Sequence, residues 1–114
     1  MRRFLVLSLI LPTVLEFLGA LSNQLVLIAN HGAFPVMATL RWLGDAPDAN
    51  GMLDDIHCVM TSATHLNFLA DVFNFHSAIL SIGDLSLGLG TYLEPYCYGF
   101  ALISVFYLLL FEAA

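Results

Sequence analysis

The sequence predicts an all-α membrane protein with two transmembrane helices joined by an ordered loop region that contains short helices. Three observations predict this class. The 114 residues are 60% hydrophobic and only 11% charged, whereas a soluble domain usually carries about 25% charged residues. Long apolar runs lie at residues 4–29 and 82–112. Between them, residues 30–80 are more polar and rich in turn-forming residues. At this length we expect one domain, residues 1–114.

The charge of the chain argues against two classes of partner. Its formal net charge is −6, and its three basic residues are all arginines. Nucleic-acid binding depends on neutralising phosphates, and attachment to anionic headgroups likewise depends on basic residues. We therefore expect insertion into a lipid bilayer, with no nucleic-acid partner.

The first apolar run, residues 4–29, is long enough to span a membrane. About 20 helical residues cross a hydrocarbon core roughly 30 Å thick. A cleaved signal peptide is the competing interpretation, because Arg2 and Arg3 give a charged start. Leu18 stands where a small residue is wanted before the cut, and the apolar run continues beyond it. A retained helix is favoured, bent but not ended by Pro12.

The second apolar run, residues 82–112, is predicted to be a kinked helix that spans the membrane mainly at residues 96–111. The kink is expected at Glu94–Pro95, because proline removes a helical hydrogen bond. A separate third crossing at residues 78–93 is the alternative, although it is short and contains an aspartate.

The stretch "SIGD", Ser81 to Asp84, has the spacing of a capping box. Ser81 would accept a hydrogen bond from a free backbone N–H of the first turn. Asp84 would return to the Ser81 amide and lie at the positive end of the helix dipole. Asp84 would then mark the membrane surface rather than the bilayer centre.

The middle segment, residues 30–80, is predicted to be folded against the membrane surface or another protein. Short helices fit residues 36–44 and 52–60. Arg2 and Arg3 flank the first span, so the positive-inside tendency places the N-terminus in the cytoplasm and the middle segment outside. The expected location is the bacterial inner (plasma) membrane.

Polar and small residues in the spans predict contact with partner helices. Glu16 is an ionisable group within a span, which is a functional-site hypothesis by default. There are two alternatives for Glu16: it lies near the membrane–water interface, or it handles an ion or a proton. Small residues allow helices to approach closely, so we expect lateral association between the two helices or within a larger complex. The residues predicted to face a partner are Glu16, Gly19, Asn23 and Ser86.

The four histidines do not form a recognisable metal or catalytic motif. Their spacing does not place two ligands on one helical turn, and we assign no metal site, cofactor or catalytic residue. His57, His65 and Asp71 are the alternative candidates for binding a metal or a proton. Cys58 beside His57 has no nucleophile signature, and a disulfide with Cys97 is not expected. The chain is predicted not to be an enzyme.

Three stretches resemble an uncharacterised family of small bacterial membrane proteins, a domain of unknown function. They are "LIANHGAFPV" (27–36), "HCVMTSATHLNFLAD" (57–71) and "LSIGDLSLGLG" (80–90). The resemblance rests on an Asn-x-Gly-x-x-Pro-Val turn, a Phe-Leu-x-Asp segment and a Ser-x-Gly-Asp helix start, over residues 23–90. The resemblance marks these residues as motif or structural positions: Asn30, Gly32, Pro35, His57, Phe68, Asp71, Ser81, Gly83, Asp84 and Gly90.

The chain departs from this family in two ways. His31 stands where members commonly have a second glycine, and there is one N-terminal span where longer members have several. Short phage-encoded versions are a further implication of the resemblance. The family brings no established activity, and Asp71 and Asp84 are interpreted as hydrogen-bonding to the loop backbone.

The sequence therefore favours a non-catalytic interaction or accessory subunit of a membrane assembly, bound to other membrane subunits or to further copies of itself. A metal- or proton-binding membrane element that uses the loop histidines is the first alternative. A phage holin-like membrane oligomer is the second, because two short spans suit such assemblies.

Overall fold

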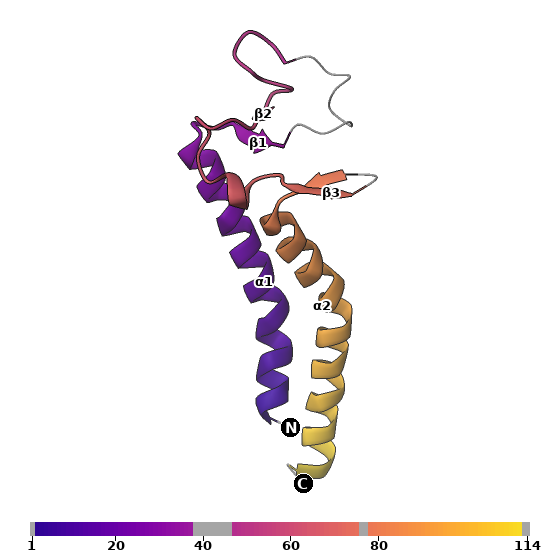
Figure 1. Ribbon diagram of the computed structural model, residues 1–114. Coiled ribbons are helices and arrows are strands. Elements are labelled where there is room, and N and C mark those ends of the chain that lie inside the picture. The colour runs from indigo at the N-terminus through magenta and orange to yellow at the C-terminus, as the bar shows by residue number, and fades with distance from the viewer. Residues whose placement is uncertain (1, 38–46, 76–77, 113–114) are drawn as a thin grey trace. The chain divides into compact units, whose positions relative to one another are not determined.

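The computed structural model describes residues 2–37, 47–75 and 78–112 (Figure 1). It contains two compact units. One combines residues 1–18 with 86–114, and the other comprises residues 19–85.

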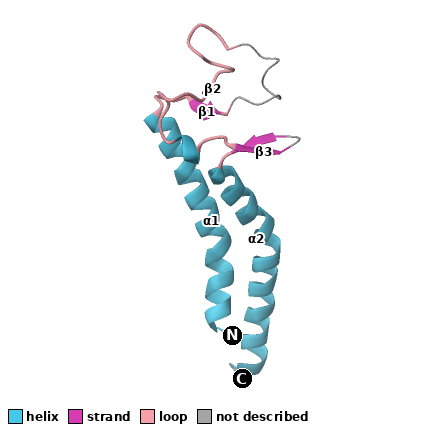
Figure 2. Cartoon of the chain, in the orientation of Figure 1, coloured by secondary structure: helices cyan, strands magenta, loops and turns pink. Residues whose placement is uncertain are grey.

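Two long helices dominate the secondary structure (Figure 2). Helix α1 covers Arg2–Ala29, and α2 covers Ile82–Tyr107 before a π-helical stretch at Leu108–Glu112. Both are long and apolar enough to cross a membrane, with mean hydropathies of 2.2 and 1.5. The two predicted helices are thus confirmed within a few residues, and each continues through its internal proline.

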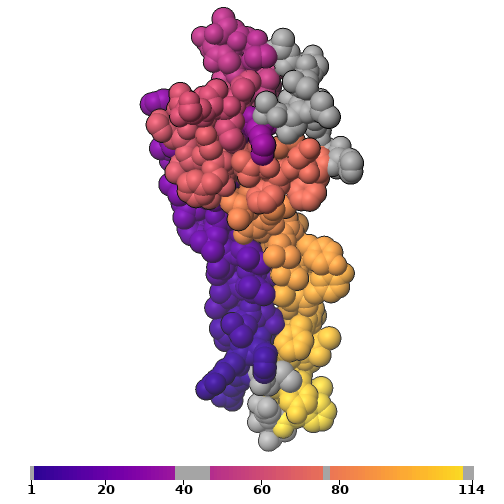
Figure 3. Space-filling model, viewed as in Figure 1, coloured from indigo at the N-terminus to yellow at the C-terminus, as the bar shows by residue number. Residues whose placement is uncertain are grey.

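The first unit is an antiparallel pairing of the N-terminal part of α1 with most of α2, and Figure 3 shows their surfaces in contact. Ser86 Oγ donates a hydrogen bond to the Leu15 carbonyl at 2.7 Å. Further along, a Cβ atom on Gly90 would lie 2.8 Å from the Pro12 carbonyl oxygen. Glycine at this position therefore allows the two helix backbones to approach closely.

The described residues of the second unit include four short strands. β1 (Phe34–Val36) pairs in parallel with β2 (His57–Val59), with Pro35 opposite Cys58. β3 (Phe73–Phe75) and β4 (Ala78–Leu80) form an antiparallel pair. A single-turn 3₁₀ helix, η1, covers Asn67–Leu69.

These strands correct the all-α prediction for residues 30–80. Residues 52–60 form β2 and its preceding turn, not the predicted short helix. The cause is local, because the Asp54 carboxylate accepts from the backbone N–H groups of Ile56 and His57. Such side-chain bonds compete with helical hydrogen bonds. Of the other predicted helix, residues 36–44, Val36 ends β1 and residues 38–44 lie outside the described part.

The hydrophobic core of the second unit lies where the end of α1 meets β1. Val26, Phe34 and Ala70 are buried there. Leu27, Met60, Leu66 and Leu69 pack against them. This small core packs β1 and η1 against the last turns of α1.

Helix α1 ends in a left-handed turn. His31 has φ of 56° and Gly32 has φ of 88°. The Gly32 N–H donates to the Leu27 carbonyl at 2.7 Å, and the His31 N–H donates to Ile28 at 3.4 Å. This is the pattern of a Schellman motif. The position where the family resemblance expects a second glycine is therefore one where a side chain is strained.

Candidate functional site

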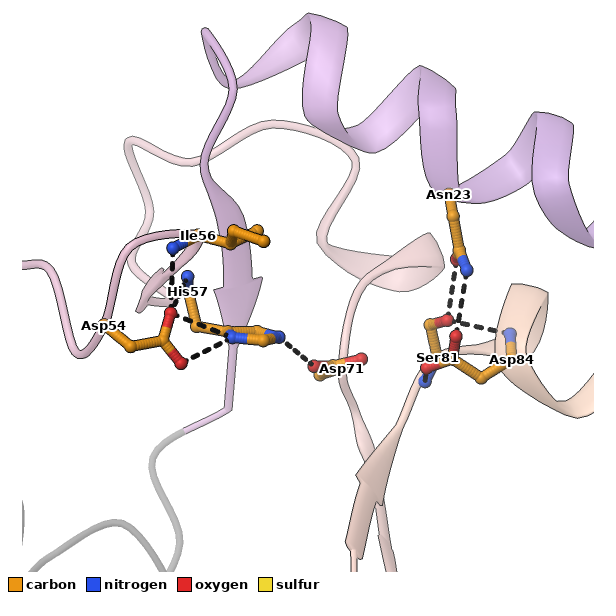
Figure 4. Close-up of polar contacts among 7 residues, drawn as sticks. All are labelled: Asn23, Asp54, Ile56, His57, Asp71, Ser81 and Asp84. Atoms are coloured by element: carbon orange, nitrogen blue, oxygen red, sulfur yellow. Dashed lines mark hydrogen bonds and ion pairs between the residues drawn. The ribbon is translucent and has the colours of Figure 1, made fainter.

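A hydrogen-bond network joins α1 to the start of α2 (Figure 4). Asn23 Nδ2 donates to Asp84 Oδ1 at 2.9 Å, and Ser81 Oγ donates to Asn23 Oδ1 at 2.8 Å. The Asp84 N–H donates to Ser81 Oγ at 3.0 Å, and the Ser81 N–H donates to Asp84 Oδ2 at 3.1 Å. The last two bonds confirm the predicted capping box, and Asn23 extends it into a three-residue network.

Gly83 makes this close approach of the helices feasible. A Cβ atom on Gly83 would lie 2.7 Å from the Gly19 carbonyl oxygen and would collide with the Asn23 side chain. Gly19 and Gly83 are both buried. Gly19, which was predicted to face a partner, thus contacts the other helix of the same chain, and Gly83 is a position of the family resemblance.

His57 is held from one side by Asp54. The His57 Nδ1 atom lies 2.8 Å from Asp54 Oδ2. Asp54 Oδ1 accepts from the backbone N–H groups of His57 at 2.6 Å and Ile56 at 2.8 Å. These backbone bonds, with a smaller contribution from the imidazole, lower the pKa of Asp54 to about 2. A stable carboxylate therefore orients the ring.

Asp71 faces the other edge of the same ring. His57 Nε2 lies 3.7 Å from Asp71 Oδ2, and Asp71 is only 5% exposed. Its Oδ1 is buried without a hydrogen-bond partner. Burial, and to a lesser degree the nearby charge of Asp84, raise the pKa of Asp71 to about 6, against the opposing effect of His57.

The predicted role of Asp71 in binding the loop backbone holds for its main chain and not for its carboxyl group. Its N–H donates to the Pro35 carbonyl at 3.1 Å, and its carbonyl accepts from Met37 at 2.9 Å. This places Asp71 in a parallel bridge with Val36. The backbone N–H and carbonyl of Asp71 therefore both form hydrogen bonds, whereas its Oδ1 has no hydrogen-bond partner.

These groups surround one pocket of about 210 Å³ within the second unit. Asp71 and Asp84 provide carboxyl groups, and His57 and Asn23 provide neutral polar groups. Its apolar wall is formed by Leu27, Phe34 and Ile56. Three motif residues that are far apart in the sequence, His57, Asp71 and Asp84, therefore share one cavity.

Other motif residues support the frame of the second unit. Asn30 Nδ2 donates to the carbonyls of Val26 at 2.9 Å and His65 at 2.8 Å, and its Oδ1 accepts from the His65 N–H at 2.7 Å. Pro35 lies in β1, and Gly32 completes the turn after α1. Phe68 is 71% exposed on η1 and supports neither frame nor pocket.

The candidate metal or proton ligands are only partly brought together. His57 and Asp71 are adjacent, but His65 does not line the pocket. Among the described residues, no three His, Cys, Asp or Glu side chains are placed to hold a metal ion. Cys58 is buried, and burial raises the pKa of its thiol, which disfavours the reactive thiolate.

The residues predicted to face a partner helix contact the other helix of the same chain. Glu16 lies against Gly90 in the first unit, and its Oε1 is buried without a hydrogen-bond partner. Glu94 and Thr91 are its polar neighbours, so a second acid, unexpected from the sequence, is present. Whether these positions also contact another protein stays a prediction.

The comparison with protein families decides the relationship of the chain to other proteins. The profile of DUF5317, described as a family of unknown function, matches residues 7–96. The chain belongs to this family. The resemblance to an uncharacterised family is thereby confirmed, and the DUF5317 match extends beyond the predicted 23–90 to include most of α1. Neither the curated proteins nor the solved structures gave a match.

Sequence reasoning missed part of the DUF5317 pocket. Leu27, Phe34 and Ile56 were not predicted as site residues, because their convergence depends on the parallel pairing of β1 and β2. Asp54 had a detectable signal, since an aspartate side chain readily accepts from the backbone N–H two residues further on.

Proposed function

We propose that this DUF5317 protein is a non-catalytic interaction subunit of a membrane assembly. On this proposal α1 and α2 cross the bacterial inner membrane as an antiparallel pair. Arg2 and Arg3 would face the cytoplasm, and the extramembrane segments would lie outside. Both helices support insertion, because only 11% of the most apolar window of each is buried within the protein.

The observation that carries the interaction role is a group of exposed apolar side chains outside the long helices. They come from η1, β3 and the turn before β2. The group, here called the extramembrane apolar residues, consists of Ile56, Phe68, Phe73 and Phe75. Exposed apolar side chains of this size in one region are typical of interaction surfaces.

The charge of this region favours a protein over anionic lipid as the occupant. Residues 47–75 contain four aspartates and no lysine or arginine. An anionic membrane surface would repel this segment. A partner membrane protein with basic residues around an apolar surface would complement both features.

Site-specific photo-cross-linking in native membranes tests the interaction role. A photoreactive amino acid at Phe68 is expected to form a cross-link of constant mass to one protein. The matched position is Ser62, an exposed residue in the turn before η1, which should give no such product. Cross-links only to lipid, or equal products at both positions, would contradict the proposal.

A proton-binding element is the second candidate, favoured by the contact of His57 with Asp71. Two titratable groups at 3.7 Å, one of them buried, can hold a proton near neutral pH. Infrared spectroscopy of the carboxyl C=O stretch should show protonation of one buried acid between pH 7 and 5 in the wild type. The signal should be absent in Asp71→Asn.

A further inference from the structure

The described residues that line the pocket of the second unit include two acids, Asp71 and Asp84, and no arginine or lysine. The chain contains no lysine anywhere. A positive group that enters the pocket would therefore meet two carboxylates that, among the described residues, form no ion pair with arginine or lysine.

Asp71 supplies the feature that points to a ligand. The residue is 5% exposed, lines the pocket and leaves Oδ1 without a hydrogen-bond partner. Figure 4 shows its carboxyl group with one oxygen toward His57 and the other on the side of Ser81 and Asp84. A buried acceptor without a partner is unfavourable, and a donor from a ligand would satisfy it.

The remaining lining distinguishes an organic cation from a bare metal ion. Ca²⁺ and Mg²⁺ need about six or more oxygen ligands, including water, and here Asn23 and Asp84 already bind each other. Leu27, Phe34 and Ile56 instead offer a surface for carbon atoms. The Phe34 ring can also attract a cation. A volume of about 210 Å³ limits the ligand to a small group.

We propose that this pocket binds a primary ammonium group, with Asp71 Oδ1 as its acceptor, the Asp84 carboxylate as a second negative charge, and Leu27, Phe34 and Ile56 around the attached carbon atoms. Two kinds of molecule carry such an ammonium group: a soluble small amine, and the headgroup of an ethanolamine lipid. The binding site does not depend on the interaction role proposed above. Only the lipid source depends on insertion into a membrane.

Calorimetric titration of the purified full chain in an uncharged detergent tests the site. Ethanolamine is expected to bind, and sodium chloride at equal ionic strength is not. Choline, which has no N–H donor, should bind at least tenfold more weakly. Equal heats for ethanolamine and sodium chloride would overturn the proposal, as would binding of choline equal to that of ethanolamine.

Substitution of Asp71 tests whether ethanolamine binds in this pocket. Asp71→Asn keeps the shape and removes the charge, so ethanolamine affinity should fall at least tenfold. Asp55→Asn removes one charge from an exposed aspartate that does not line the pocket and should bind like the wild type. Unchanged affinity in Asp71→Asn would overturn the proposal.

The wild-type chain provides a second test if Asp71→Asn does not fold. Asp71 is faced by His57 from β2, which is held by Asp54, and by Asp84 from α2. Protonation of Asp71 removes an acceptor, so ethanolamine affinity should fall at least threefold from pH 7.5 to 5. Affinity that stays constant or rises would contradict the site.

Nanodiscs separate the two sources of the ammonium group. If an ethanolamine lipid fills the pocket, soluble ethanolamine should bind in phosphatidylcholine discs and be displaced in phosphatidylethanolamine discs. Equal binding in both discs would assign the site to a soluble amine. Absence of binding in both discs and in detergent would overturn the proposal.

Discussion

Asn23 and Asp84, 61 positions apart in the sequence, are joined by a 2.9 Å hydrogen bond that ties α1 to the first turn of α2. The same amide accepts from Ser81, so one side chain on α1 engages both members of the capping box. The start of α2 is therefore defined jointly by its own sequence and by a residue of the other helix.

Replacement of Asn23 by alanine should destabilise the second unit. Asp84 and Ser81 would each lose a partly buried hydrogen-bond partner, at a cost of about 1–3 kcal/mol for each unsatisfied group. Thermal unfolding in detergent measures the effect. Gln24→Ala, at the adjacent exposed position, is the control and should change stability by less than about 0.5 kcal/mol. Equal effects of the two substitutions would contradict a stabilising role for the Asn23 hydrogen bonds.

Substitution of Gly90 by alanine should disturb the helix pairing of the first unit. The new Cβ would lie 2.7 Å from Glu16 Cγ and 2.8 Å from the Pro12 carbonyl oxygen, and such overpacking costs about 1–3 kcal/mol. Gly88→Ala is the matched control, because nothing lies within 4 Å of its Cβ position. It should stabilise α2 by about 0.5–1 kcal/mol. A neutral Gly90→Ala would contradict the close packing.

Substitution of His31 by glycine should stabilise the chain. His31 has φ of 56°, and a left-handed conformation costs a side-chain-bearing residue about 1–2 kcal/mol. Ala33→Gly is the control, since Ala33 has no positive φ and should lose about 0.5–1 kcal/mol. Denaturant unfolding in mixed micelles can rank the three proteins, and His31→Gly should rank first.

The stability of the second unit should fall as pH rises from about 4 to 7. The pKa of Asp71 is raised from 3.8 to about 6 in the folded chain, so the folded state binds this proton more tightly than the unfolded state. The stabilisation is complete below the unfolded pKa and is lost as pH passes through about 6. A rise in the pKa of Asp71 from 3.8 to about 6 corresponds to roughly 3 kcal/mol of stability.

Asp71→Asn should abolish this fall, and Asp55→Asn should preserve it. Asp54 has the opposite sign, because its pKa is lowered to about 2. Its contribution is present above about pH 4 and is lost only toward pH 2, outside the measured window. Melting temperatures at half-unit pH steps are sufficient, and a wild-type profile parallel to that of Asp71→Asn would contradict the assignment.

The local features of the fold were predictable, and the long-range ones were not. Hydropathy located both helices, and the spacing of Ser81 and Asp84 revealed the capping box. The strands were missed because each is three residues long, too short for a periodic pattern. The pairing of β1 with β2 also depends on contacts between segments more than 20 residues apart, such as Pro35 with Cys58.

The candidate site was predicted as separate residues and not as a pocket. His57, Asp71 and Asp84 each belong to a family-like motif, yet the sequence gives no distance between them. Asn23 was interpreted as facing a partner helix, because a polar residue in an apolar run has the same pattern whether its partner lies in the same chain or another. Only the fold distinguishes these cases.

The most direct test of the membrane account is impermeant maleimide labelling of single-cysteine chains in intact cells, with Cys58 and Cys97 replaced by serine. The two positions compared are Ser62→Cys, between the long helices, and Phe4→Cys, at the N-terminal end of α1. In a separate control, isolated membranes are washed with alkaline carbonate and should retain the chain. The account predicts labelling of Cys at 62 in intact cells and labelling at 4 only after permeabilisation. Release of the chain by carbonate, or equal labelling of both positions in intact cells, would contradict it.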